Sequence, residues 1–194
     1  MKNTYMKTDC IKNDLKASLS KNRYRHTENV IVESARLARI YGADVEKAKF
    51  IALIHDRFRD VDDETLNELI TGYGMDPVYN NNNALAHGPL AAAYYKDKFD
   101  IIDDEILNSV RYHTTGRQGM GLQEKIIFLA DAIEKDRCYD GVERIRSEAA
   151  KDIDRGVEAS LENTVDHLNK QNRYIDNNTL KALEYIRGGS FDRK

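Results

Sequence analysis

Residues 122–135 read LQEKIIFLADAIEK, a segment whose central part, residues 126–133, is apolar almost all round. A helix with apolar side chains on every side is typical of the buried centre of a domain. Asp131 stands in the middle of this run, where an unpaired carboxylate is costly. Such a carboxylate caps a neighbouring helix, pairs with an arginine or binds a cation, and this segment alone leaves all three open.

The rest of the chain is also predicted to be helical. Only two prolines, Pro77 and Pro89, occur, and no alternating apolar–polar run indicates a strand. Apolar residues at helical spacing, acidic N-caps and C-terminal glycines predict helices over about 24–41, 44–55, 62–72, 88–99, 103–113, 122–135 and 179–187, with one long or two broken helices over 142–172. The helix after Gly88 is expected to start there because proline is tolerated in a first turn. Residues 75–83, MDPVYNNNN, are predicted to be a loop. We therefore expect an all-α protein, a single compact helical bundle of about eight or nine helices.

The composition fits one soluble domain over residues 1–194. Hydrophobic residues make up 41% of the chain and charged residues 32%, with a net charge of −3. This charge gives no reason to expect a nucleic-acid partner, and no apolar run approaches the ~20 residues that span a bilayer, so we expect no membrane partner. The N-terminal MKNTYMKTDC lacks the apolar core of a signal peptide. Cys10 and Cys138 lack motif spacing, so we expect a cytoplasmic protein with reduced thiols.

Four of the five histidines fall on inward faces or ends of predicted helices. His26 and His113 lie on apolar helix faces, His55 and Asp56 end an apolar helix, and His87 precedes a predicted helix start. Each histidine alone fits a packed core residue. Together with Asp56 and Asp131 they form a set of six nitrogen and oxygen ligands. The fifth histidine, His167, is interpreted as a solvated or packing residue of a charged helix.

A ligand set without thiolates suits a first-row transition metal such as iron, manganese, cobalt or zinc. Six protein ligands exceed what one catalytic ion needs, so we expect two ions, with the Asp56 carboxylate as the candidate bridge.

Groups that can bind phosphate follow the candidate ligands directly. Arg57 and Arg59 come after Asp56, and the sequence TTGR, residues 114–117, comes after His113. Arginine forks, hydroxyls and backbone N–H groups at a glycine turn all bind phosphate oxygens. The alternative for residues 114–117 is a plain helix C-terminus that ends at its glycine.

The order H…HD…H…H…D resembles the HD-domain superfamily of metal-dependent phosphohydrolases. The closer resemblance is to its YqeK-type branch, the symmetrical diadenosine tetraphosphate hydrolases. It covers about residues 23–146, which would form the core of the domain, with C-terminal helices over 147–190. The similar segments are RYRHTENVIVESARLARIYG (23–42), KAKFIALIHD (47–56), LAHGPLAA (85–92), ILNSVRYHTTGRQGM (106–120) and LQEKIIFLADAIEKDR (122–137). HTTGR and FLADAIEKDR are specific to this branch.

The resemblance implies a role for each candidate residue. One ion, iron by the resemblance, is held by His26, His55, Asp56 and Asp131; the second is held by His87 and His113, with Asp56 bridging. Phosphate is contacted by Thr114, Thr115, Gly116, Arg117 and Arg137. Arg59, expected to act in catalysis together with Asp56, occupies the position where the superfamily usually has lysine, so a planar fork replaces a compact charge. Arg57 stands where the family tends to have an aromatic or small residue.

The implied substrate is diadenosine tetraphosphate or a related dinucleoside polyphosphate. The implied products are two nucleoside diphosphates such as ADP or GDP, which the site should retain. Two other hypotheses stay open: a nucleotidase that uses the same metals on mononucleotides, and a metal-dependent sensor or interaction module without catalysis. A homodimer is one candidate assembly.

Overall fold

The computed structural model describes residues 8–189, and all regular elements in that range are helical. The all-α prediction is confirmed. The elements are α2 (Thr8–Ser18), α3 (Lys21–Tyr41), α4 (Val45–Ile54), α5 (Asp63–Gly72), the 3-10 helix η1 (Pro77–Tyr79), α6 (Asn83–Phe99), α7 (Asp104–Tyr112), α8 (Leu122–Ile133), α9 (Val142–Ala149), α10 (Ile153–Lys170) and α11 (Asn177–Gly189). The described range excludes residues 1–7, which belong to the segment predicted to lack a signal peptide. It also excludes residue 190, the last residue of the predicted C-terminal helical region.

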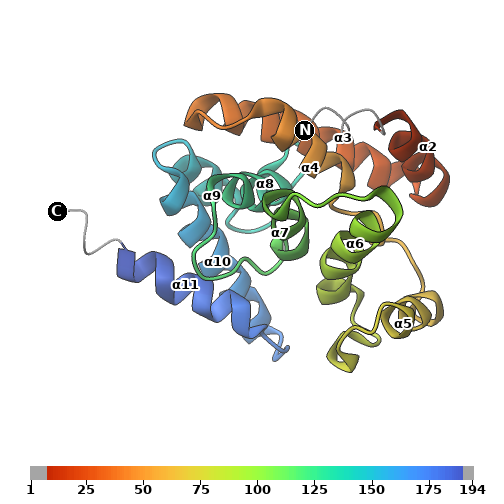
Figure 1. The fold of residues 1–194 in the computed structure, drawn as a ribbon. Coiled ribbons are helices and arrows are strands. Elements are labelled where there is room, and N and C mark those ends of the chain that lie inside the picture. The colour runs from red at the N-terminus through yellow and green to blue at the C-terminus, as the bar shows by residue number, and fades with distance from the viewer. Residues whose placement is uncertain (1–7, 190–194) are drawn as a thin grey trace.

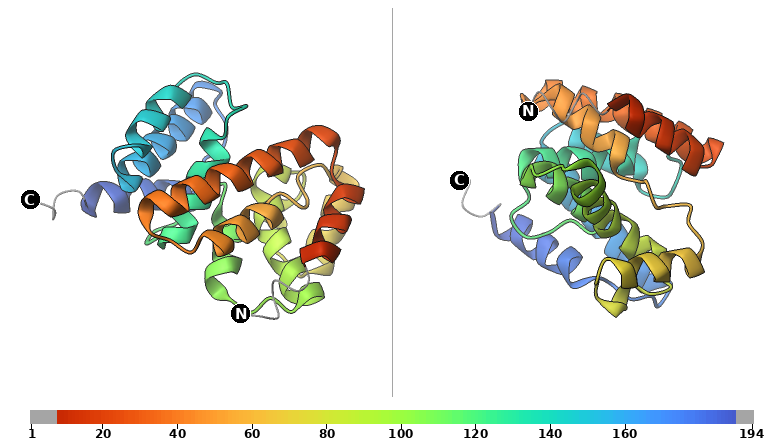
Figure 2. Two further views of the ribbon diagram at one scale, coloured as in Figure 1. Left: turned by 90° about the horizontal axis from the view of Figure 1, so that it is seen from above. Right: turned by 45° about the vertical axis from the view of Figure 1, so that its right-hand side comes forward.

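Helix α8 is the centre of the domain, as its apolar sequence predicts. It packs against α3, α4, α7, α9 and α10. Figures 1 and 2 show α2, α3 and α4 along one side of it, the α5–α6 arm at one end and α9–α11 at the other. Ile126, Leu129 and Ala130 are fully buried. The predicted buried central helix is therefore confirmed.

The helix ends follow the capping residues that the sequence shows. The side chains of Asp44, Asp62 and Asp103 accept backbone N–H groups at the starts of α4, α5 and α7. Gly42 ends α3 with a left-handed φ of 71°, a conformation that glycine adopts without steric cost. Residues 142–170 form two helices, α9 and α10, the second of the two predicted alternatives.

The N-terminal helix α2 was not predicted, and it brings the count among residues 8–189 to ten α-helices rather than eight or nine. Ile11 and Leu15, four residues apart, are fully buried, and α2 packs on α3 and α4. This short apolar stripe is the signal that would have found it.

The predicted start of α6 near Gly88 is wrong. The helix begins at Asn83, so Pro89 lies inside it and His87 belongs to the helix rather than preceding it. Proline inside a helix removes one backbone hydrogen bond and crowds the preceding turn. Burial of Ala86, Leu90 and Tyr95 on the face of α6 outweighs that local cost.

Within the described part of the chain, each helix is too short or too polar to cross a membrane.

Gly88 sets the distance between α6 and α7. A Cβ atom at this position would lie 2.9 Å from the carbonyl oxygen of Val110, 3.0 Å from that of Arg111 and 3.1 Å from Nδ1 of His113. Only glycine permits this approach, which places His87 of α6 next to His113 at the end of α7.

We expect Gly88→Ala to lower the free energy of unfolding by about 1–3 kcal/mol, because the added methyl group overpacks rigid backbone. The matched control is Gly72→Ala in α5, where a Cβ would meet no atom within 4 Å. There the loss of chain entropy in the unfolded state should leave stability unchanged or raise it by up to about 1 kcal/mol. Urea unfolding of both variants measures the difference. Equal stabilities would contradict the assigned role of Gly88.

Candidate metal centre

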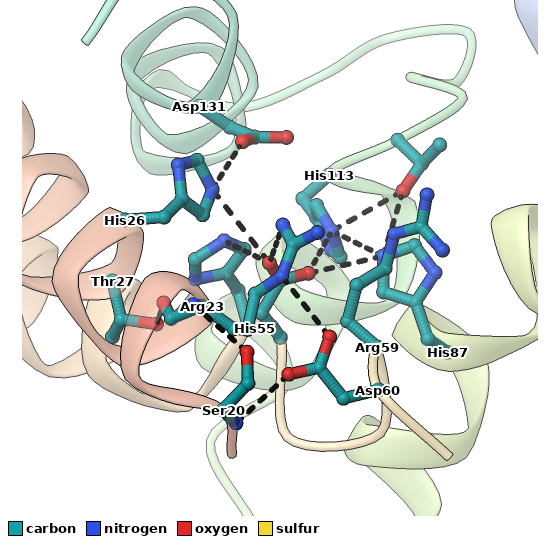
Figure 3. A network of polar contacts seen from close by, with 12 residues as sticks. Ser20, Arg23, His26, Thr27, His55, Arg59, Asp60, His87, His113 and Asp131 are labelled. Atoms are coloured by element: carbon teal, nitrogen blue, oxygen red, sulfur yellow. Dashed lines mark hydrogen bonds and ion pairs between the residues drawn. The ribbon is translucent and has the colours of Figure 1, made fainter. Parts of the chain in front are cut away.

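The six candidate ligands come together from five segments of the chain. His26 lies on α3, His55 and Asp56 directly follow α4, His87 lies on α6, His113 directly follows α7, and Asp131 lies in the last turn of α8. Figure 3 shows the imidazoles of His26, His55, His87 and His113 gathered in one place, with Asp131 beside His26. The side chains of the four histidines and Asp56 are buried, whereas that of Asp131 is 22% exposed. Asp131 therefore stands at the mouth of the cluster and not at its closed end.

The two oxygens of Asp56 face different histidines. Its Oδ2 lies 3.6 Å from Nε2 of His26 and 3.5 Å from Nε2 of His55. Its Oδ1 lies 3.3 Å from Nε2 of His87 and 3.8 Å from Nε2 of His113. The carboxylate thus stands between two pairs of imidazoles, which is the arrangement that a bridging ligand needs.

All four imidazoles are held through the nitrogen that points away from the cluster. The Nδ1 atoms of His55, His87 and His113 each lie 2.7 Å from a backbone carbonyl oxygen, those of Ala52, Asn83 and Val110. A carbonyl oxygen can only accept, so each Nδ1 carries a proton and each Nε2 presents a lone pair. In His26 the Nδ1 lies 3.1 Å from a carboxylate oxygen of Glu134. Hydrogen bonds of this kind are those that orient metal-binding histidines.

Nε2 of His26 lies 2.9 Å from Oδ1 of Asp131, but the other three inward-facing nitrogen atoms are poorly satisfied. Nε2 of His55 is buried and has no hydrogen-bond partner. Nε2 of His87 and Nε2 of His113 lie 2.9 Å apart, so their two lone pairs repel unless a proton or a cation lies between them. Potential ligand atoms of His26, His55 and Asp131 all lie within 4.8 Å of one another, as do those of His55, Asp56 and His113. The residues therefore fit a metal centre by their chemistry.

The protonation of His113 and of Asp56 agrees with this fit. Burial, together with the charges of His87 and His55, lowers the pKa of His113 to about 3, so its imidazole is neutral at pH 7. Burial alone would raise the pKa of Asp56, but its electrostatic interactions with the surrounding imidazoles, first of all His55 and His87, outweigh burial and hold that pKa well below its usual range. Neutral imidazole and ionised carboxylate are the forms that bind metal.

Three residues at the cluster were missed or only partly anticipated. Arg23 was not predicted, and its Nη1 donates to Oδ2 of Asp56 at 2.9 Å. Arg137, predicted to bind phosphate, donates from Nη2 to Oδ1 of Asp131 at 2.5 Å. Glu134, also not predicted, is buried and accepts from Asn29 at 3.0 Å while it faces His26. An acidic residue after an apolar helix and an arginine three residues before His26 were the available signals.

The side chains of the two arginines after the His-Asp pair point in different directions. Arg57 points away from the cluster and makes a two-point ion pair with Asp14 of α2, at 2.6 and 3.0 Å, beneath which lie the rings of Phe58 and Tyr94. Arg59 donates to the side chain of Asn83 at 2.9 Å and is drawn beside His87 in Figure 3. Arg57 therefore anchors α2, and Arg59 is the arginine that remains near the candidate ligands.

The residues of segment 114–117 also differ in whether they lie near the candidate ligands. Oγ1 of Thr114 lies 3.3 Å from Nε2 of His87 and 3.2 Å from Nε2 of His113, at the cluster itself. The N–H of Gly116 instead donates to the carbonyl of Tyr112, and Gly116 is buried with a φ of 65°. Arg117 makes a two-point pair with Glu124, both distances 2.8 Å. Gly116 thus behaves as the glycine that ends a helix, and Arg117 is already paired, so of these residues the structure brings only Thr114 to the ligands.

The similarity of this chain to known proteins covers the whole candidate site. The profile of the HD domain matches residues 23–136, which contain all six candidate ligands. A protein of Halalkalibacterium halodurans, named symmetrical bis(5'-nucleosyl)-tetraphosphatase, is 38% identical over 89% of this chain and 92% of its own length. A Bacillus subtilis protein of the same name is 33% identical over 91% and 95%.

A solved structure gives the same result. A Clostridium acetobutylicum protein, described as a predicted HD superfamily hydrolase involved in NAD metabolism, superposes with a TM-score of 0.87 at 33% identity, covering 94% of this chain and 97% of that one. The family match spans the majority of the chain, and the relatives are matched almost from end to end. The chain belongs to the HD-domain family.

Proposed function

We propose that this protein is a metal-dependent hydrolase that cuts diadenosine tetraphosphate symmetrically into two molecules of ADP. The observation that carries the proposal is the convergence of four oriented Nε2 atoms on the Asp56 carboxylate, with Asp131 at the open side. The names of the relatives that match almost end to end supply the substrate class.

Two ions would divide the six ligands between them. His26, His55 and Asp131, with Oδ2 of Asp56, would hold the first ion, and His87 and His113, with Oδ1 of Asp56, would hold the second. Imidazole and carboxylate ligands without thiolate suit iron, with manganese, cobalt or zinc as alternatives. When bound, such ions lower the pKa of a water molecule and neutralise negative charge on phosphate.

The protein's own residues would bind and orient the polyphosphate. Arg59 and Thr114 lie on the His87 side of the cluster, and Arg137 lies on the Asp131 side. Fixed positive groups and hydroxyls at these positions would stabilise the charge that develops on phosphate oxygens. In the reaction, the oxygen of water bonds to an inner phosphorus and the bond from that phosphorus to the central bridging oxygen breaks. The electron pair leaves with the second ADP, and the two protons of the water are released as the new terminal phosphate groups ionise.

Location and assembly stay predictions. Cys10 and Cys138 are exposed and free, as reduced thiols would be in the cytoplasm that we propose. A homodimer remains the candidate assembly.

Asp56→Ala should lose both ions, because its two oxygens face the two ligand groups. His87→Ala or His113→Ala should chiefly lose one ion. His167→Ala is the control, since this exposed histidine lies outside the six and should retain the full metal content. Elemental analysis of protein purified without oxygen or chelators, together with circular dichroism to check the fold, measures this. Wild-type metal content in Asp56→Ala would rule out the bridge.

Arg59→Ala should lower turnover by about one to three powers of ten, the effect of removing one charge-stabilising group, while metal content stays the same. Arg59→Lys should keep most of the activity if positive charge is what matters there. Its neighbour provides a matched control: Arg57→Ala should keep turnover but lose about 1–3 kcal/mol of stability, because the pair with Asp14 is broken. A wild-type rate in Arg59→Ala would transfer the phosphate role to another arginine.

Diadenosine tetraphosphate should give two ADP with little AMP plus ATP. Chromatography of early products, with oxygen-18 water to mark the attacked phosphorus, tests this outcome. Equal amounts of AMP and ATP would place the attack at an outer phosphorus. Hydrolysis of mononucleotides alone would support the nucleotidase hypothesis, and no turnover of any phosphoanhydride by the metal-loaded protein would support the non-catalytic one.

A further inference from the structure

Two large cavities border Thr114, the residue that follows the candidate ligand His113. The first, of about 720 Å³, lies between the end of α8, residues 139–141 and α10, and His113 and Asp131 contribute to its wall. The second, of about 550 Å³, lies between residues 78–85 and the connection from α10 to α11. Both volumes fall within the ~300–1,000 Å³ that is usual for small-molecule sites.

The two cavities meet at the cluster. Three residues line both of them: Thr114, Thr164 and Leu168. Thr164 and Leu168 lie four residues apart on α10, so one face of that helix separates the two spaces. Oγ1 of Thr114 lies 3.3 Å from Nε2 of His87 and 3.2 Å from Nε2 of His113. A molecule that extends from one cavity into the other at Thr114 therefore passes directly over candidate metal ligands.

Each cavity also contains one exposed tyrosine ring. Tyr139 in the first cavity is 38% exposed, and its hydroxyl donates to the carbonyl of Ala132 at 2.8 Å, which holds the ring in place. Tyr174 in the second cavity is 63% exposed. Exposed aromatic rings are the surfaces on which nucleic acid bases stack.

The remaining lining supplies polar groups for the rest of a nucleoside. The first cavity contains Asn163 and Lys170, and the second contains Asn82 and Arg173. Amide side chains can pair with base edges or ribose hydroxyls, and a cation in each cavity suits a chain of phosphates that leads away from it.

We propose that the two cavities are two nucleoside subsites, one for each end of the substrate, with the polyphosphate crossing between them at Thr114. This inference rests on the proposed function and deepens it. With one nucleoside on each side, the centre of the phosphate chain lies at the metal ligands. Symmetrical cleavage then follows from the position of the subsites, because the bond at the centre of the chain is the one presented to the reacting water.

The test compares Tyr139→Ala and Tyr174→Ala with Tyr185→Ala, whose ring on α11 is 54% exposed but lines neither cavity. Each of the first two variants should raise KM for diadenosine tetraphosphate by about 5- to 150-fold, the effect of one lost base–aromatic contact, with little change in kcat. Tyr185→Ala should match the wild type. Calorimetry should give two bound ADP per chain for the wild type and for Tyr185→Ala, and one at matched concentration for each cavity variant.

The outcomes separate this inference from the proposed function. One bound ADP in the wild type, or a wild-type KM in Tyr174→Ala, would overturn the two-subsite arrangement while symmetrical hydrolysis still holds. Absence of diadenosine tetraphosphate hydrolysis by the wild-type, metal-loaded protein would instead overturn the proposed function. A fall in kcat with unchanged KM in either cavity variant would show that its tyrosine positions the reaction and does not bind a base, which would also overturn the inference.

Discussion

The site depends on one constraint: four imidazoles are fixed through Nδ1 so that four Nε2 atoms converge on the carboxylate of Asp56. For His55 and His113 the fixing group is a carbonyl three residues earlier, in the last turn of α4 and of α7. Carbonyls in the last turn of a helix have no partner within the helix. Each ring therefore satisfies a carbonyl that would otherwise need water, and the same hydrogen bond directs the opposite nitrogen into the cluster.

This arrangement is unfavourable without positive charge at its centre. Nitrogen lone pairs that face one another at 2.9 Å and a buried Nε2 without a partner raise the free energy of the folded chain unless a cation offsets them. Arg23 and Arg137 supply part of that charge at the edges, through Asp56 and Asp131. Neither is placed between the imidazoles of His87 and His113. Packing around α8 therefore stabilises the fold enough to tolerate a site that becomes favourable only when a metal binds.

The sequence predicted well that the six candidate ligands lie together, because each is an ionisable residue on an apolar helix face or at its end, and helical periodicity reports which face is buried. It failed where the outcome depends on distant partners. Arg57 and Arg59 look equivalent in the sequence, yet Asp14, 43 residues earlier, draws Arg57 away. The start of α6 was misplaced because local proline preference was given more weight than the burial of Leu90 and Tyr95. Arg23 was missed because its partner Asp56 belongs to another helix end.

The direction of three helices explains why a phosphate-binding site at this place would need metal ions as well as arginines. Helices α4, α7 and α8 all bring their C-terminal ends to the cluster, where His55, His113 and Asp131 lie. The C-terminal end of a helix carries partial negative charge, so three such ends attract cations and repel phosphate. A polyphosphate therefore gains nothing from these helix dipoles, in contrast to a phosphate bound at a helix N-terminus. Under the proposed function, its binding would rest on bound metal ions and on side chains such as Arg59 and Arg137, which would link substrate affinity to metal content in this fold.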